Sequence, residues 1–151
     1  MIRIGKYVNT HGIKGEIRIL SDFSRKDLIF KKGFKIYIKD NEFIINSYRK
    51  HKDYDMVTLE GINNINDIID LKGNYVYIKR EDIDDFIDED LYEYNVVVRD
   101  KEYKIINIIE NKAHKILVLN NNVMVPYVSE FVEKKDDIGK KLYMKLPDNL
   151  M

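Results

Sequence analysis

The sequence contains no cysteine and no tryptophan, a single alanine and two prolines among its 151 residues. Without cysteine there is no disulfide, no thiolate zinc site, no iron–sulfur cluster and no thiol nucleophile. The scarcity of alanine beside 23 isoleucines disfavours long helices and favours pleated strands. No apolar run approaches the ~20 residues that span a bilayer, and the first residues lack the apolar core of a signal peptide. We therefore expect a soluble, cytoplasmic protein.

The net charge of zero hides two halves of opposite sign. Residues 1–80 hold 16 basic and 10 acidic residues, whereas residues 81–151 hold 10 basic and 16 acidic ones. This division predicts different partners for the two halves, with the basic half suited to nucleic acid and the acidic half to a basic protein. The simpler alternative is that the two halves merely have solvent-exposed surfaces of opposite charge.

Short segments of alternating apolar and polar residues fill the first half, which is typical of half-buried strands. One brief helix is expected over 63–73, with four apolar residues on one face and Gly73 at its C-terminal cap. A small closed barrel fits so strand-rich a segment better than an open sheet, because closure removes exposed edges. We expect this barrel to span 1–80, and its strands to lie near 2–4, 16–19, 34–39, 42–48, 57–59 and 75–79.

An acidic segment separates this half from a second group of strands. Residues 81–93 include eight acidic residues and no basic one, so we expect a linker there. Strands are predicted afterwards, together with a short helix over 130–134. The second unit, 94–151, is therefore also expected to be all-β. The predicted fold is all-β, with two small units and one or two short helices.

The sequence offers little material for catalysis. Its three histidines lie in separate segments without an i,i+4 partner, and no metalloprotease or serine-centred motif is present. The acidic run lacks the central glycine and closing glutamate of an EF-hand loop. We expect no enzymatic activity, no metal and no cofactor.

One loop is dense in unusual residues. Gly12 and Gly15 bracket two residues, a spacing that suggests positive φ or close backbone approach at both glycines. The loop could present its polar side chains to phosphates or to another protein. Alternatively, it is a tight connection in which His11 caps nearby backbone groups. The candidate contact residues are Thr10, His11, Gly12, Lys14, Gly15 and Arg18.

The stretch 5–19, with its Thr-His-Gly, two residues and Gly-Glu, resembles the N-terminal signature of the RimM family of ribosome maturation factors. Further segments follow in the family's order, over nearly the whole chain. They are Ser21-Asp22-Phe23, Leu59-Glu60-Gly61-Ile62, Leu71-Lys72-Gly73, Val125-Pro126-Tyr127-Val128 and the closing residues 142–150.

The resemblance implies two β-barrels, an N-terminal one related to translation-factor barrels and a C-terminal PRC barrel. It also implies a non-catalytic assembly factor that binds small-subunit ribosomal protein S19. Such a factor assists maturation of the head of the 30S subunit and processing of 16S rRNA. The expected partners are therefore S19 and the immature small subunit with its rRNA. The protein itself is expected to be a monomer in the cytoplasm.

The family carries an aromatic pair just before its second barrel, which matters for binding the ribosomal protein. Leu91-Tyr92 occupies that place here, and Glu93 stands where a tryptophan often follows. The resemblance thus assigns ribosomal-protein binding to Tyr92, Leu91 and Glu93, with Tyr92 as the anchor, because interface energy concentrates in a few aromatic contacts. The alternative is that Tyr92 is a core or inter-domain residue.

RNA contact by the first barrel is expected through charge, with Lys14 and Arg18 facing phosphates. No stacked-aromatic RNA motif is visible in the sequence. Two rival functions remain open at this point. One is a general translation-factor-like barrel that binds RNA, and the other is a PRC-barrel adaptor unrelated to ribosomes.

Overall fold

The computed structural model describes residues 1–151 and divides into two compact units, Met1–Phe86 and Ile87–Met151. Nearly all regular structure is β, as the sequence predicts. The exceptions are one four-residue α-helix, α1 (Lys26–Ile29), and four short 3-10 helices: η1 (Ile65–Asp67), η2 (Ile69–Leu71), η3 (Arg80–Asp82) and η4 (Asp88–Glu93). No helix is long and apolar enough to cross a membrane.

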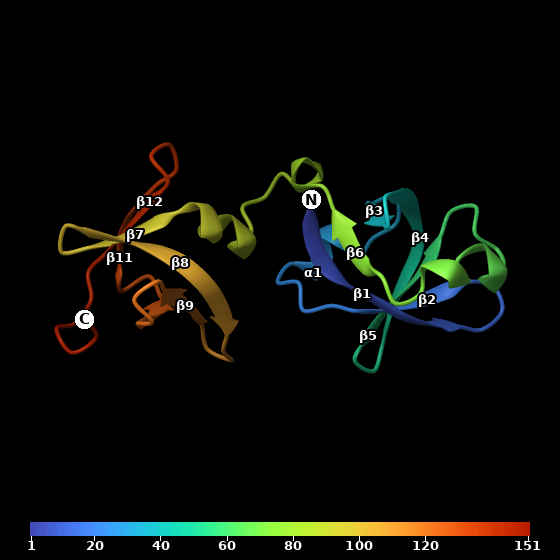
Figure 1. Ribbon diagram of the computed structural model, residues 1–151, viewed down its shortest axis with the longest axis horizontal. Helices are drawn as coiled ribbons and strands as arrows, with labels where there is room; N and C mark the ends of the chain where they lie inside the picture. Colours follow the sequence, from blue (N-terminus) through green and yellow to red (C-terminus); the bar gives the residue numbers. More distant parts are fainter. The chain divides into compact units, whose positions relative to one another are not determined.

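The first unit is a closed six-stranded barrel (Figure 1). The strands are hydrogen-bonded in the order β1-β2-β5-β4-β3-β6, and β6 pairs back onto β1. Closure leaves no free edge in this unit. The strands are β1 (Ile2–His11), β2 (Glu16–Leu20), β3 (Lys35–Ile38), β4 (Asn41–His51), β5 (Tyr54–Leu59) and β6 (Tyr75–Ile78).

Alternation along these strands fills the barrel with apolar side chains, because successive residues of a strand point to opposite faces. Register shifts interrupt the pairing of β1 with both neighbours, and such bulges bend a strand enough to close a small barrel. At Gly5, beside one bulge, a Cβ atom would lie 2.6 Å from the carbonyl oxygen of Leu20. Glycine is therefore required where β1 passes closest to β2.

The helix expected over 63–73 is present only as the two 3-10 turns η1 and η2. The side-chain oxygen of Asn64 accepts a hydrogen bond from the backbone N–H of Asn66 at 2.8 Å and starts the first turn. Of the expected apolar face, only Ile68 is fully buried. The segment is short and rich in isoleucine, a residue with modest helix propensity, so it packs as tight turns and not as an α-helix.

The second unit is a six-stranded sheet with the order β10-β9-β8-β7-β12-β11. All neighbours are antiparallel except β12 and β7, which are parallel. The strands are β7 (Asn95–Val98), β8 (Lys101–Glu110), β9 (Lys115–Leu119), β10 (Met124–Tyr127), β11 (Val132–Asp136) and β12 (Lys141–Met144). Strand β11 covers most of the segment for which the sequence suggested a helix over 130–134.

This second sheet curls around one core but is not closed by a ladder, because β10 and β11 remain its two edges. Val125 of β10 and Val132 of β11 nevertheless pack on the same apolar cluster, which gives the unit the shape of a half-barrel. Both edge strands carry residues that disfavour pairing with a further strand. Pro126 has no N–H to donate to a further strand, and β11 carries Lys134 and Lys135.

The acidic segment expected as a linker, 81–93, is divided between the two units. The guanidinium of Arg80 donates to the carbonyl oxygens of Ile83 (2.6 Å) and Asp85 (3.0 Å), which fixes the first part to the barrel. Leu91, in the second part, is fully buried in the core of the second unit. The boundary thus falls inside the segment, after Phe86, because apolar residues along it pack into different cores.

One buried carboxylate ties three elements of the barrel together. Asp55 of β5 is fully buried, and its Oδ1 accepts a 2.6 Å hydrogen bond from the hydroxyl of Tyr48 on β4. Its Oδ2 lies 2.8 Å from the Nζ of Lys26 in α1. Burial, together with the hydrogen bond to Asp55, raises the pKa of Tyr48 to about 12.

Replacing Asp55 by alanine should destabilise the first unit by about 1–3 kcal/mol, because the partly exposed hydroxyl of Tyr48 and ammonium of Lys26 would lose their buried partner. Calorimetric unfolding of the full chain measures this. Asp53→Ala, at an exposed position of the same hairpin, is the control and should change stability by less than about 0.5 kcal/mol. Equal unfolding temperatures for Asp55→Ala and the parent would contradict the structural role.

Candidate functional site

The glycine loop joins β1 to β2 at one end of the barrel, and contacts with the segment after β5 hold it in place. Gly12 and Gly15 both have positive φ, at +71° and +88°. A Cβ atom on Gly15 would lie 3.0 Å from a methyl carbon of Ile62, and the backbone N–H of Ile65 donates to the carbonyl oxygen of Ile13 at 2.9 Å. The loop therefore rests on the segment that follows β5 and holds its side chains outward.

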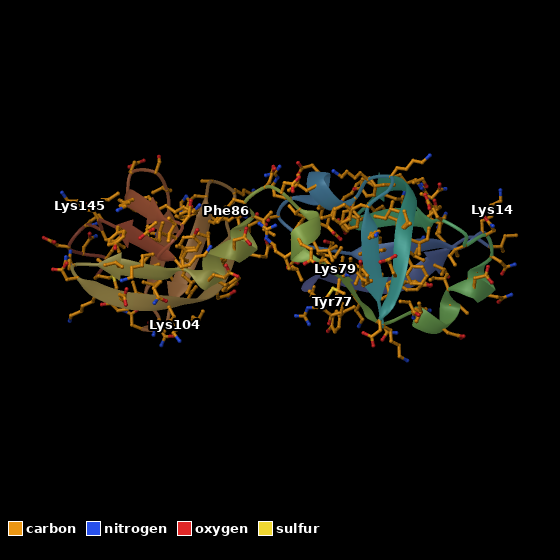
Figure 2. The ribbon with its side chains drawn as sticks, turned by 90° about the horizontal axis from the view of Figure 1, so that it is seen from above. Lys14, Tyr77, Lys79, Phe86, Lys104 and Lys145 are labelled. Carbon is orange, nitrogen blue, oxygen red and sulfur yellow. The ribbon has the colours of Figure 1, made fainter.

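Two of the predicted contact residues lie together. The Nη2 of Arg18 is 2.9 Å from the Nδ1 of His11, and the guanidinium lies 5.6 Å from the ring centroid of Tyr54. Lys14 is exposed, at the end of the barrel (Figure 2). Thr10 is different, because it is half-buried within the ladder, opposite Ile17.

Three residues that the sequence analysis did not select complete this end of the barrel. Glu16 accepts hydrogen bonds from the Nε and Nη2 of Arg49 at 2.9 and 2.7 Å. This bond, with the nearby positive charges, holds the pKa of Glu16 below its usual value, although partial burial opposes the shift. The ring of His51 lies 6.2 Å from that of His11. Glu16 lies in the motif of the stretch 5–19, whereas Arg49 and His51 were marked only by the basic run 49–52, whose position beside β2 depends on tertiary pairing.

Two hollows flank Lys14, with volumes of about 410 and 700 Å³. Lys14 and Thr58 line both of them, His11 and Glu16 line the smaller, and Glu60 lines the larger. Both hollows are open, so this surface suits contact with an extended chain better than enclosure of a small molecule. No group of three or more histidine, aspartate or glutamate side chains is arranged so as to hold a metal ion.

In the second unit, the three residues assigned to ribosomal-protein binding have different environments. Leu91 is fully buried, whereas Tyr92 is 46% exposed. The hydroxyl oxygen of Tyr92 accepts a hydrogen bond from the backbone N–H of Ile108 on β8 at 3.0 Å. Glu93 is exposed and lies 3.8 Å from the Nζ of Lys140. The short helix η4 is thus held by Leu91 while it presents the ring of Tyr92.

Tyr94, two residues further on, is a core residue, unlike Tyr92. It is 2% exposed, and its hydroxyl donates a 2.6 Å hydrogen bond to Asp137. Burial is the main reason why the pKa of Tyr94 rises to about 12, and the bond to Asp137 adds to it. The two tyrosines therefore have different environments, with the ring of Tyr94 in the core and the ring of Tyr92 on the surface.

Several carboxylates of the acidic segment are engaged within their own unit. The Asp88 carboxylate lies 3.0 Å from the Nζ of Lys115, and Asp90 accepts the backbone N–H of Ile87 at 2.9 Å. In the first unit, Asp85 lies 3.6 Å from Arg25. The acidic run is therefore not one continuous strip of free charge.

Comparisons with known proteins place these features in context. The model of the RimM N-terminal domain matches residues 2–83. Proteins named ribosome maturation factor RimM, from the RF122 / ET3-1 and JH9 strains of Staphylococcus aureus, are 34% identical to this chain, with 99% of this chain and 98% of theirs covered.

Two solved structures are also similar. One is a Pseudomonas aeruginosa protein described as a putative 16S ribosomal RNA processing protein, RimM, with 17% identity, a TM-score of 0.48 and 98% of each chain covered. The other is the N-terminal domain of RimM from Thermus thermophilus, with 18% identity and a TM-score of 0.46. This second likeness covers 54% of this chain and 91% of that chain.

Proposed function

The chain belongs to the RimM family of ribosome maturation factors, and we propose that it works by binding and not by catalysis. Its second unit holds small-subunit ribosomal protein S19, and its first unit touches the immature small subunit and its rRNA. In this way it assists maturation of the head of the 30S subunit and processing of 16S rRNA. It acts in the cytoplasm, as a monomer.

The observation that best supports a protein-binding role is the exposed ring of Tyr92. A large aromatic side chain in solvent gains free energy when a partner covers it, and such residues dominate interface energies. Burial of Leu91 and the hydrogen bond from Ile108 fix the ring in place, so little side-chain freedom is lost on binding.

The charge of the second half supports a basic partner, since proteins that bind rRNA carry many lysines and arginines. The excess of six acidic residues over 81–151 would attract such a protein over distance. Because Asp88 and Asp90 already have partners in their own unit, these carboxylates contribute to encounter more than to the final contact. Tyr92 then provides most of the binding affinity, and the acidic surface raises the association rate.

For RNA contact, the first unit offers Lys14 at the loop tip and the paired Arg18 and His11 beside it. The rigid loop keeps these groups at one end of the barrel. Cations of this kind bind phosphates without reading sequence, and the contact releases counterions. Family membership and this arrangement leave the ribosome-independent adaptor without support.

Tyr92→Ala should weaken the affinity of the full chain for S19 by at least tenfold, because the interface loses its aromatic anchor. Isothermal titration with purified S19 measures the change. Ile138→Ala removes another exposed apolar side chain of the same unit, at 97% exposure, and should leave the affinity unchanged. An affinity of Tyr92→Ala within twofold of the parent would refute the proposed anchor.

Lys14→Ala should weaken binding to immature small subunits and flatten its salt dependence. The slope of log K against log salt should fall by about 0.7–0.9, the contribution of a single phosphate contact. Filter binding from low to high salt gives the slope. Lys145→Ala, an exposed lysine of the second unit, serves as a charge-matched control and should leave the slope unchanged. A parent affinity that does not vary with salt would exclude a charge-led contact.

A further inference from the structure

A second surface of the barrel combines the exposed ring of Tyr75 and the half-buried ring of Tyr77 with positive charge. On β6, Val76 and Ile78 point into the core, so Tyr75 and Tyr77 point outward. Tyr75 is 45% exposed. The two rings lie ~6.6 Å apart along the strand, at two residue rises. Neither residue belongs to the glycine loop or to the segment around Tyr92.

Cross-strand pairing places cations beside these rings. Arg3 of β1 stands opposite Tyr77, and Lys6 stands opposite Tyr75. Directly opposed residues share a face of the sheet, so all four side chains are on the outer wall. The guanidinium carbon of Arg3 lies 4.5 Å from the Tyr75 ring centroid, and the Nζ of Lys6 lies 5.8 Å from it.

The wall is hollowed and continues to β3. A cavity of about 330 Å³ lies next to Tyr75, between Arg3, Lys6 and the 51% exposed side chain of Leu20. Beyond Tyr77, the Nζ of Lys79 lies 5.2 Å from the ring centroid of Tyr37. Tyr77 and Lys79 lie side by side on this wall (Figure 2).

We infer that this wall, formed by Arg3, Lys6, Tyr75, Tyr77 and Lys79, binds single-stranded RNA by stacking bases on the tyrosine rings and pairing phosphates with the cations. Sheet faces that carry exposed aromatic rings beside lysine and arginine hold single strands in this way, largely without sequence preference. Tyr75 lines a cavity of about 330 Å³, and the planar guanidinium of Arg3, which lines it too, provides a second surface for stacking.

The charges on the wall favour RNA over a protein partner. Three cations lie along it, and fewer carboxylates are close to them. Asp22 lines the cavity together with Arg3 and Lys6, whereas Glu42 accepts the hydroxyl of Tyr37 at 3.1 Å, and Glu81 and Asp82 follow Lys79. A positive strip interleaved with aromatic rings complements a chain that alternates phosphates and bases.

This wall is separate from the loop surface at Lys14, which lies at the far end of the barrel (Figure 2). The loop presents its cations beside the imidazole of His11, whereas the wall presents its cations beside two tyrosine rings. The inference deepens the proposed contact with rRNA, on which its biological meaning rests. The binding itself can nevertheless be measured without ribosomes or S19.

The test uses the full chain and an eight-nucleotide oligouridine RNA that carries one 2-aminopurine, a fluorescent base whose emission falls when it stacks. The parent should bind this RNA and quench the probe. Tyr75→Ala should weaken binding about tenfold and remove most of the quenching, whereas Tyr75→Phe, which keeps the ring, should stay within twofold of the parent. An abasic chain of equal length should bind the parent about tenfold more weakly.

Tyr92→Ala is the matched control, since it removes an exposed tyrosine from the other unit and should not alter RNA binding. Should Tyr75→Ala fail to fold, the double variant Arg3→Gln and Lys6→Gln tests the same wall, with an expected loss of affinity and a smaller salt slope.

Unchanged quenching and affinity in these wall variants would overturn the inference, as would a parent that binds the abasic chain equally well. Competition by a polyglutamate peptide at the same affinity would point to an acidic protein and overturn it too. Titration of S19 on the same samples separates the two proposals, because Tyr75→Ala should leave S19 affinity intact. Absence of S19 binding by the parent, with quenching retained, would refute only the proposed function.

Discussion

The pairing of β6 with β1 is the constraint on which the first unit depends. It closes the barrel, and it brings the tyrosines of β6 against Arg3 and Lys6, which stand some 70 residues away in the sequence. Closure also fixes the ends of the strands, so that the loop between β1 and β2 can rest on the segment after β5. The buried Asp55 supports the same frame from the opposite side, through α1 and β4. Both candidate RNA surfaces are thus products of one closed ladder.

In the second unit, a short helix packed on an open sheet, and not the closure of a barrel, positions the candidate binding surface. Its sheet keeps two edges, and the helix η4 is held against β8 by the buried Leu91 and by the bond between Tyr92 and Ile108. The fixed ring of Tyr92 is then available to a partner, while Tyr94 serves the core. Two tyrosines only two positions apart thus differ in burial, and only the exposed one, Tyr92, is a candidate for contact with a partner.

The sequence was sufficient to predict the all-β fold and the approximate places of the strands, because alternation with period two is a local property that the folded chain keeps. Strand β1, however, continues to His11, well beyond the expected 2–4. Other expectations depended on tertiary structure. The helix over 63–73 became two 3-10 turns, and most of the segment 130–134 became part of the edge strand β11. The acidic run had the composition of a linker, yet its isoleucine and leucine side chains pack into two cores. His11 and Arg18 could be grouped from the sequence since they share a hairpin, whereas Arg49, His51 and Tyr75 reach their neighbours only through long-range pairing.

The central claim is that this chain acts by binding small ribosomal subunits while they are still incomplete. Sedimentation of cell extract through a sucrose gradient, with detection of the untagged protein across the fractions, tests it directly. The account predicts that the protein travels with immature small subunits and is depleted from mature 30S subunits and 70S ribosomes. Recovery only at the top of the gradient, or in equal amounts on mature and immature subunits, would contradict it.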